Sequence, residues 1–129
     1  MARRILTLCL LLSCSVVHAE WAMVGRNEDL RLFVDRDALQ RDGDVATISQ
    51  LVDYTHAQWA GSMVVMSVRQ LVEYDCRNVR TRTVAGVAYS EQMGNGRQVT
   101  AQRMPDAEWV PVPAEGTPNQ LWRIACSRE

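Results

Sequence analysis

The sequence has few of the groups that metal binding and most catalytic chemistry require. After residue 19 it contains one histidine, His56, and two cysteines, Cys76 and Cys126. Two thiols and one imidazole are too few for a zinc-type site. A single histidine without a recognisable nucleophile motif gives no basis for a catalytic triad. No glycine-rich loop separates a strand from a helix, so no phosphate site is expected. We therefore expect a protein that is not an enzyme and has no metal or cofactor.

Long apolar runs are also scarce, and the one present lies at the N-terminus. It extends from residue 5 to residue 17, follows Arg3 and Arg4, and ends in Val17-His18-Ala19. A basic start, a short apolar run and small residues before a cleavage point are typical of a secretory signal peptide. A membrane span needs about 20 apolar residues. The sequence thus predicts a signal peptide over residues 1–19, one domain over residues 20–129 and no transmembrane helix.

The leader also contains a weaker alternative. Leu11-Leu12-Ser13-Cys14 loosely resembles a lipobox, in which Cys14 would be lipidated and would anchor the protein to a membrane. Leu12 is bulkier than lipobox residues usually are, and an ordinary cleavage site follows at Ala19. We favour cleavage after Ala19. Either route predicts an exported protein, in the periplasm or at the outer cell surface.

A surplus of basic charge is absent from the predicted domain. The leader holds two of the 14 basic residues and none of the 15 acidic ones, so the remainder carries 12 and 15, a formal net charge of −3. Nucleic-acid binders normally carry a basic surplus. This charge therefore argues against a nucleic-acid partner.

The two cysteines of the domain form an even pair in an exported chain, which predicts a disulfide between Cys76 and Cys126. Two separate buried thiols are the alternative. The bridge would close a loop of 50 residues, which the chain-entropy model values at about 4 kcal/mol. That is a large share of a typical domain stability of about 5–15 kcal/mol.

The pattern of apolar and turn-forming residues predicts a sheet of about six strands. We place the strands at residues 21–25, 30–34, 45–54, 63–76, 81–90 and 98–102. Asp35 is expected to cap a short helical turn that runs to Gln40, residues 56–62 are expected to form a loop, and Asn95-Gly96 favours a hairpin. In the fourth strand Cys76 shares the expected core face with Val72 and Tyr74.

The C-terminus has the pattern of a short helix. Thr117 before Pro118 fits an N-cap followed by proline at the first helical position. Residues 119–127 would form the helix, with Leu121, Ala125 and Cys126 within one broad face. A helix of about ten residues is marginal alone, so the disulfide would hold it on the sheet. The expected fold class is α+β.

Several segments resemble the surface-adhesin protein E family, and together they extend over nearly all of residues 20–126. The strongest are Leu71-Val72-Glu73-Tyr74-Asp75-Cys76, Met93-Gly94-Asn95-Gly96, Trp109-Val110-Pro111-Val112 and Leu121-Trp122-Arg123-Ile124-Ala125-Cys126. The resemblance implies an antiparallel sheet with a C-terminal helix packed on one face and tethered by a disulfide. It also implies adhesion to host or matrix proteins.

Two features are candidate partner-binding sites. Arg69, Arg80 and Arg82 lie on neighbouring predicted strands and could form a positive patch for an acidic partner. The alternative, which we favour, is a solvated sheet face balanced by Glu73 and Asp75. Trp59 could anchor a partner, although we favour a tryptophan folded back over a sheet edge.

Two functions are consistent with these features. The first is an adhesin-like binding domain whose partner is a host extracellular-matrix or envelope protein. The second is a periplasmic envelope protein with a structural role that interacts through a sheet edge. A homodimer is left open.

Overall fold

The computed structural model describes residues 19–127. The predicted leader and the choice between cleavage after Ala19 and lipidation at Cys14 involve residues 1–18, which lie outside this range. Within the described range, no helix has the length and apolar character needed to cross a membrane.

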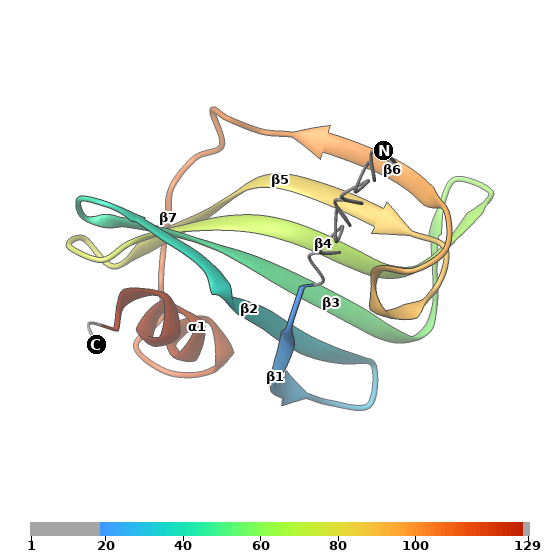
Figure 1. Cartoon of the computed structure of the whole chain (residues 1–129), viewed down its shortest axis with the longest axis horizontal. Helices are drawn as coiled ribbons and strands as arrows, with labels where there is room; N and C mark the ends of the chain where they lie inside the picture. Colours follow the sequence, from blue (N-terminus) through green and yellow to red (C-terminus); the bar gives the residue numbers. More distant parts are fainter. Residues whose placement is uncertain (1–18, 128–129) are drawn as a thin grey trace, which may run out of the picture.

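One antiparallel sheet dominates the described part of the chain, with its long strands side by side in chain order (Figure 1). They are β1 (Trp21–Arg26), β2 (Leu30–Asp42), β3 (Val45–Ala60), β4 (Met63–Asp75), β5 (Arg80–Tyr89) and β6 (Gln98–Arg103). The short strand β7 (Val110–Pro111) pairs with β5, and a 3₁₀ turn, η1 (Gln92–Gly94), lies between β5 and β6. The predicted antiparallel sheet is confirmed.

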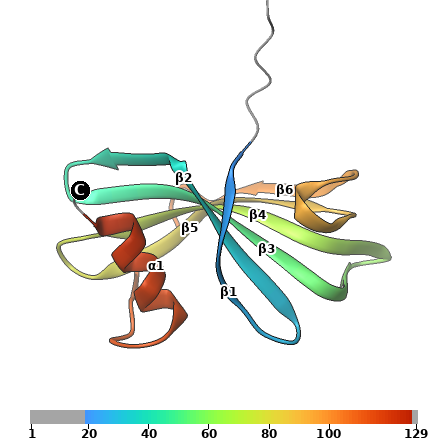
Figure 2. The same cartoon turned by 60° about the horizontal axis from the view of Figure 1, so that its bottom comes forward.

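The helix α1 (Thr117–Cys126) packs against one face of this sheet, as Figure 2 shows. Its apolar side contributes the buried residues Leu121 and Ala125. Alternate residues of the central strands meet them and form the core: Leu32, Val34, Ala46, Ile48, Val72 and Tyr74. The predicted core face of β4 is confirmed where α1 covers it. We call this surface of the sheet the helix face.

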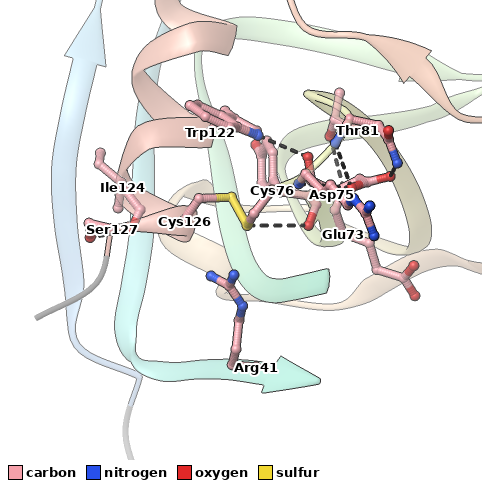
Figure 3. The surroundings of a disulfide bond; sticks show 12 residues. Arg41, Glu73, Asp75, Cys76, Thr81, Trp122, Ile124, Cys126 and Ser127 are labelled. Atoms are coloured by element: carbon pink, nitrogen blue, oxygen red, sulfur yellow. Dashed lines mark hydrogen bonds between the residues drawn. A yellow bond between two sulfur atoms is a disulfide. The ribbon is translucent and has the colours of Figure 1, made fainter. Parts of the chain in front are cut away.

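The Cys76–Cys126 disulfide joins the end of α1 to the residue that follows β4 (Figure 3). The two Cα atoms are 5.6 Å apart, within the usual range for a bridge. One turn earlier, the Trp122 indole Nε1–H donates a hydrogen bond of 3.0 Å to the Asp75 carbonyl oxygen. The predicted bridge is confirmed, and it has a hydrogen bond beside it.

The helical turn expected from Asp35 to Gln40 is wrong, because β2 continues to Asp42. The pairing with β3 is interrupted between Asp35 and Gln40 and then resumes. This bulge lets Leu39 pack against the core beside α1, which a capped turn at this place would forgo. The Asp37 N–H still donates a hydrogen bond of 3.2 Å to Asp35 Oδ1, so the local preference of aspartate is met inside the bulge and not at the start of a helical turn.

The loop expected at residues 56–62 is also wrong. β3 and β4 continue past the sheet as a two-stranded arm, in which Gln58 pairs with Val65 and Ala60 pairs with Met63. Gly61 has a φ of +62° in the tight turn at the tip, a backbone conformation that favours glycine. The arm therefore forms because a permissive turn allows the hairpin to close.

The start of α1 differs from the expected one by a residue. Gly116 occupies the N-cap position with a φ of +87°, and Thr117 is the first helical residue. Proline follows within the first turn, where its missing N–H costs nothing. The expected cap at Thr117 is therefore wrong.

Removing the disulfide should weaken the domain as a whole. We expect the paired substitution Cys76→Ala and Cys126→Ala to lower the free energy of unfolding by about 2–4 kcal/mol, because the bridge restricts the unfolded chain. Urea denaturation followed by circular dichroism measures this. A reductant should weaken the natural protein by a similar amount and leave the variant unchanged. An equally stable variant would show that the bridge does not hold α1.

Candidate functional site

Among residues 19–127, no α-helix covers the surface of the sheet opposite α1, and we call this surface the open face. Because side chains alternate along a strand, it carries the residues between those of the core, such as Phe33, Leu51 and Leu71. Two connecting segments cover its ends. One is η1 with the loop around it, and the other is the segment 104–109 between β6 and β7.

Hydrogen bonds to two buried side chains hold η1 against the open face. The Asp53 and Ser67 residues are fully buried. The Met93 N–H donates to Asp53 Oδ1 at 2.7 Å, and the Gly94 N–H donates to Ser67 Oγ at 2.9 Å. Arg31 forms an ion pair with the other oxygen of the Asp53 carboxylate. A buried carboxylate is costly unless it is paired, so Asp53 depends on these partners and fixes η1 in return.

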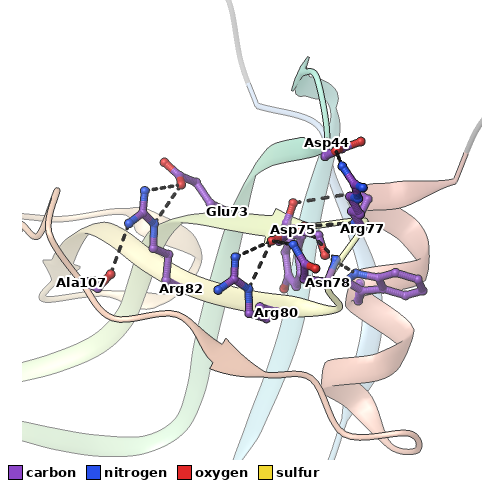
Figure 4. Close-up of polar contacts among 11 residues, drawn as sticks. Asp44, Glu73, Asp75, Arg77, Asn78, Arg80, Arg82 and Ala107 are labelled. Carbon is purple, nitrogen blue, oxygen red and sulfur yellow. Dashed lines mark hydrogen bonds and ion pairs between the residues drawn. The ribbon is translucent and has the colours of Figure 1, made fainter.

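Two arginines and a tryptophan hold the opposite end, as Figure 4 shows for the polar contacts. The Arg80 guanidinium lies 2.7 Å from Asp75 and the Arg82 guanidinium lies 2.9 Å from Glu73. Arg82 also donates to the Ala107 carbonyl oxygen at 3.3 Å. Both guanidinium groups lie over the Trp109 ring, at 5.3 and 4.4 Å from its centre, a distance at which the cation and the ring attract each other.

The Asp75 carboxylate is the centre of this cluster. It accepts hydrogen bonds from the backbone N–H groups of Asn78 and Arg77, at 2.9 and 3.0 Å, and from Arg80. These hydrogen bonds hold the pKa of Asp75 well below its usual range. The bond from the Asn78 N–H has the largest effect, and the bond from the Arg80 side chain has the next largest. Asp75 is therefore charged at neutral pH and organises the turn between β4 and β5.

Between the two covered ends, the open face is hollowed. The hollow has a volume of about 740 Å³, and a second one of about 350 Å³ adjoins it. They share Leu71, Ala85 and Val87 in their linings, so the two are continuous and together are called the hollow in the sections that follow. Ala101 and Arg103 on β6 line the first hollow, and Arg69 on β4 lines the second. Alanine side chains leave space that larger side chains would fill. The sheet surface at the bottom of the hollow, which we call its floor, is therefore recessed and apolar.

The three candidate arginines share the open face. Arg69 is opposite Val87, Arg82 is opposite Glu73, and Arg80 is opposite Asp75 in the pairing of β4 with β5. Arg80 and Arg82 each have a carboxylate partner. Arg69 is exposed, and its guanidinium lies over the Trp21 ring at 5.9 Å from the ring centre. Among the described residues, no carboxylate is ion-paired with Arg69.

Trp59 lies elsewhere, on the arm. Its side chain is 67% exposed, so the expectation that it folds back over the sheet edge is wrong. It pairs with Val64 and lines neither hollow. The structure therefore does not bring Trp59 together with the arginines.

Sequence reasoning missed the residues of β6, because the alternation of a half-exposed edge strand does not say what its side chains face. That Ala101 and Arg103 line the hollow follows only from the strand register, which places them beside Val87 and Ala85. The small residues Ala85 and Ala101, which the register places on the same face, were the available signal, since strands normally favour larger side chains.

Comparison with known proteins gives a family and a fold. The model of the family described as surface-adhesin protein E matches residues 21–127. A crystal form II structure of Haemophilus influenzae protein E is similar, with 17% identity and a TM-score of 0.67, over 90% of this chain and 94% of that one. Protein E from non-typeable Haemophilus influenzae has 15% identity and a TM-score of 0.62, over 88% and 79%. No curated protein matches.

The Asp75 cluster predicts a specific response to acid. Because the folded protein holds the pKa of Asp75 below its ordinary value of 3.8, the charged carboxylate stabilises the folded state above pH 3.8. This stabilisation is lost progressively as the pH falls from 3.8 toward the lower pKa of the folded state. Asp75→Asn should therefore lower the free energy of unfolding at pH 7 by about 1–3 kcal/mol, and the difference from the natural protein should shrink below pH 3.8. Urea titrations at several pH values measure this.

The exposed Asp106 provides a matched control, because no hydrogen bond or ion pair to its side chain is found among the described residues. Asp106→Asn should leave the pH dependence unchanged. If the difference between Asp75→Asn and the natural protein stayed constant from pH 7 to pH 3, the assignment of this acid response to Asp75 would be wrong.

Proposed function

We propose that this chain, which belongs to the surface-adhesin protein E family, is an exported non-enzymatic module that binds protein partners with its open face. The family is described as a surface adhesin, and the partner class that we propose is a host extracellular-matrix or envelope protein. The module would act at the outer cell surface or in the periplasm.

The observation that carries this proposal is that the two faces of the sheet are covered to different extents. α1 closes the helix face over the main core, whereas the open face keeps a hollow with an apolar floor between η1 and segment 104–109. Leu71 in this floor is 39% exposed. Apolar surface rimmed by polar groups is the usual character of a protein-binding surface.

Among the candidate residues, Arg69 is the best placed for a direct contact. It is exposed at the edge of the hollow and has no ion-paired carboxylate in the described part of the chain. Arg80 and Arg82 belong to the same proposed surface, where Asp75 and Glu73 hold their guanidinium groups in fixed positions. Trp59 is proposed as a separate contact, since an exposed tryptophan on a projecting arm is a typical anchor.

A capture experiment tests the proposal. The processed, oxidised protein is immobilised and exposed to matrix and envelope proteins, and bound protein is measured by surface plasmon resonance. Arg69→Ser combined with Leu71→Ser should weaken capture at least about tenfold, because both a cation and apolar surface are removed from the contact.

Arg123→Ser is the matched control, because Arg123 is an exposed arginine on α1, away from the open face. It should leave capture unchanged, and circular dichroism should show that all variants are folded. Equal capture by the two variants would contradict a role for the open face, and absence of any capture by the natural protein would contradict the proposed function.

A further inference from the structure

The register of three strands arranges the side chains of the hollow in two rows. One row consists of Arg69 on β4, Val87 on β5 and Ala101 on β6. The next row on the same face consists of Leu71, Ala85 and Arg103. Each row thus has one arginine, at opposite ends. Four apolar side chains occupy the remaining positions between the two cations.

Sheet geometry sets the spacing of the two arginines. Neighbouring strands are about 4.8 Å apart, so β4 and β6 are separated by about 10 Å. Two residues along a strand advance about 7 Å. The Cα atoms of Arg69 and Arg103 are therefore about 12 Å apart on the diagonal, across an apolar floor.

The charges around the floor do not cancel. Glu73 also lines the hollow, but its carboxylate is paired with Arg82. In the part of the chain that the structure describes, the ion pairs involve neither Arg69 nor Arg103. Both are exposed. The hollow therefore presents two cations without carboxylate partners, one on each side of an apolar surface.

We propose that the hollow binds an extended protein segment with two acidic residues four positions apart and an aliphatic residue midway between them. In an extended chain, residues i, i+2 and i+4 point to the same side. Positions i and i+4 are about 13 Å apart, which matches the diagonal between the arginines. The aliphatic side chain then lies over Ala85 and Ala101, whose small size provides the space.

The position of β6 provides access for such a segment. β6 is the last strand of the path that begins at β1, so a chain can approach the floor across its edge. Binding uses two charge-assisted contacts and the burial of one aliphatic side chain, which is a modest contact and predicts a salt-sensitive affinity. This inference rests on the proposed function, because it takes the open face to be a protein-binding surface.

Labelled peptides test this partner class directly by fluorescence anisotropy with the processed, oxidised protein. The probe is Gly-Glu-Thr-Leu-Thr-Glu-Gly, which places both glutamates and the leucine on one side. We expect saturable binding that weakens with added salt. A peptide with glutamine in place of both glutamates, and one whose glutamates are three positions apart and so point to opposite sides, should each bind at least about tenfold more weakly.

Protein variants locate the binding. Arg69→Gln combined with Arg103→Gln should weaken binding of the probe at least about tenfold, and so should Ala101→Tyr, because its ring would occupy the floor. Ala101 is exposed on an edge strand, where tyrosine is well tolerated. Arg123→Gln should have no effect. The inference would be overturned if the natural protein, the double arginine variant and the Ala101→Tyr variant (the last two called the groove variants) bound the probe equally. It would also be overturned if the peptides with the two glutamate spacings bound equally.

This outcome can be separated from that of the capture experiment. If matrix or envelope proteins are captured but the natural protein does not bind the probe, or binds it no better than the groove variants do, the inference about the hollow is wrong while the proposed function stands. If the probe binds and the groove variants abolish it, but no matrix or envelope protein is captured, the inference stands and the proposed function fails.

Discussion

The Cys76–Cys126 disulfide decides which face of the sheet is closed, because it fixes α1 directly over the end of β4. A helix of ten residues would be marginal alone. Once it is held there, Tyr74 is buried, and its hydroxyl oxygen accepts a hydrogen bond from Gln50 Nε2 inside the core. Burial raises the pKa of Tyr74 to about 12, so the phenol stays neutral and the core remains uncharged.

Because α1 closes the helix face, the described part of the chain covers the open face only at its ends, with η1 and with segment 104–109. We call these two segments the covers. Two carboxylates hold these covers in place, Asp53 beneath η1 and Asp75 at the turn after β4. Each has an arginine partner and backbone N–H donors, which is the arrangement that a carboxylate removed from water requires. The apolar floor between them stays accessible. The same fold that makes the domain stable on one side thereby leaves a binding surface on the other.

Sequence patterns were sufficient for the sheet, the helix and the bridge, since alternation, helix signals and an even cysteine pair are local or countable. They failed where tertiary packing decides. β2 bulges after Asp35, and Leu39 packs against the core beside α1. Gly61 adopts a positive φ, which allows a hairpin arm to form where a loop was expected. The pairing of Arg80 and Arg82 and the apolar surroundings of Arg103 depend on the register between strands, which no local pattern specifies.

The central claim is that partners bind the face opposite α1. Nuclear magnetic resonance of the ¹⁵N-labelled, oxidised protein, titrated with the glutamate–leucine–glutamate probe, tests it residue by residue. If partners bind the open face, the amides of α1 should be unchanged, and the shifts should concentrate on Arg69, Leu71, Ala85, Val87, Ala101 and Arg103. Shifts concentrated on α1 or on the arm around Trp59, with the floor of the hollow unaffected, would contradict it.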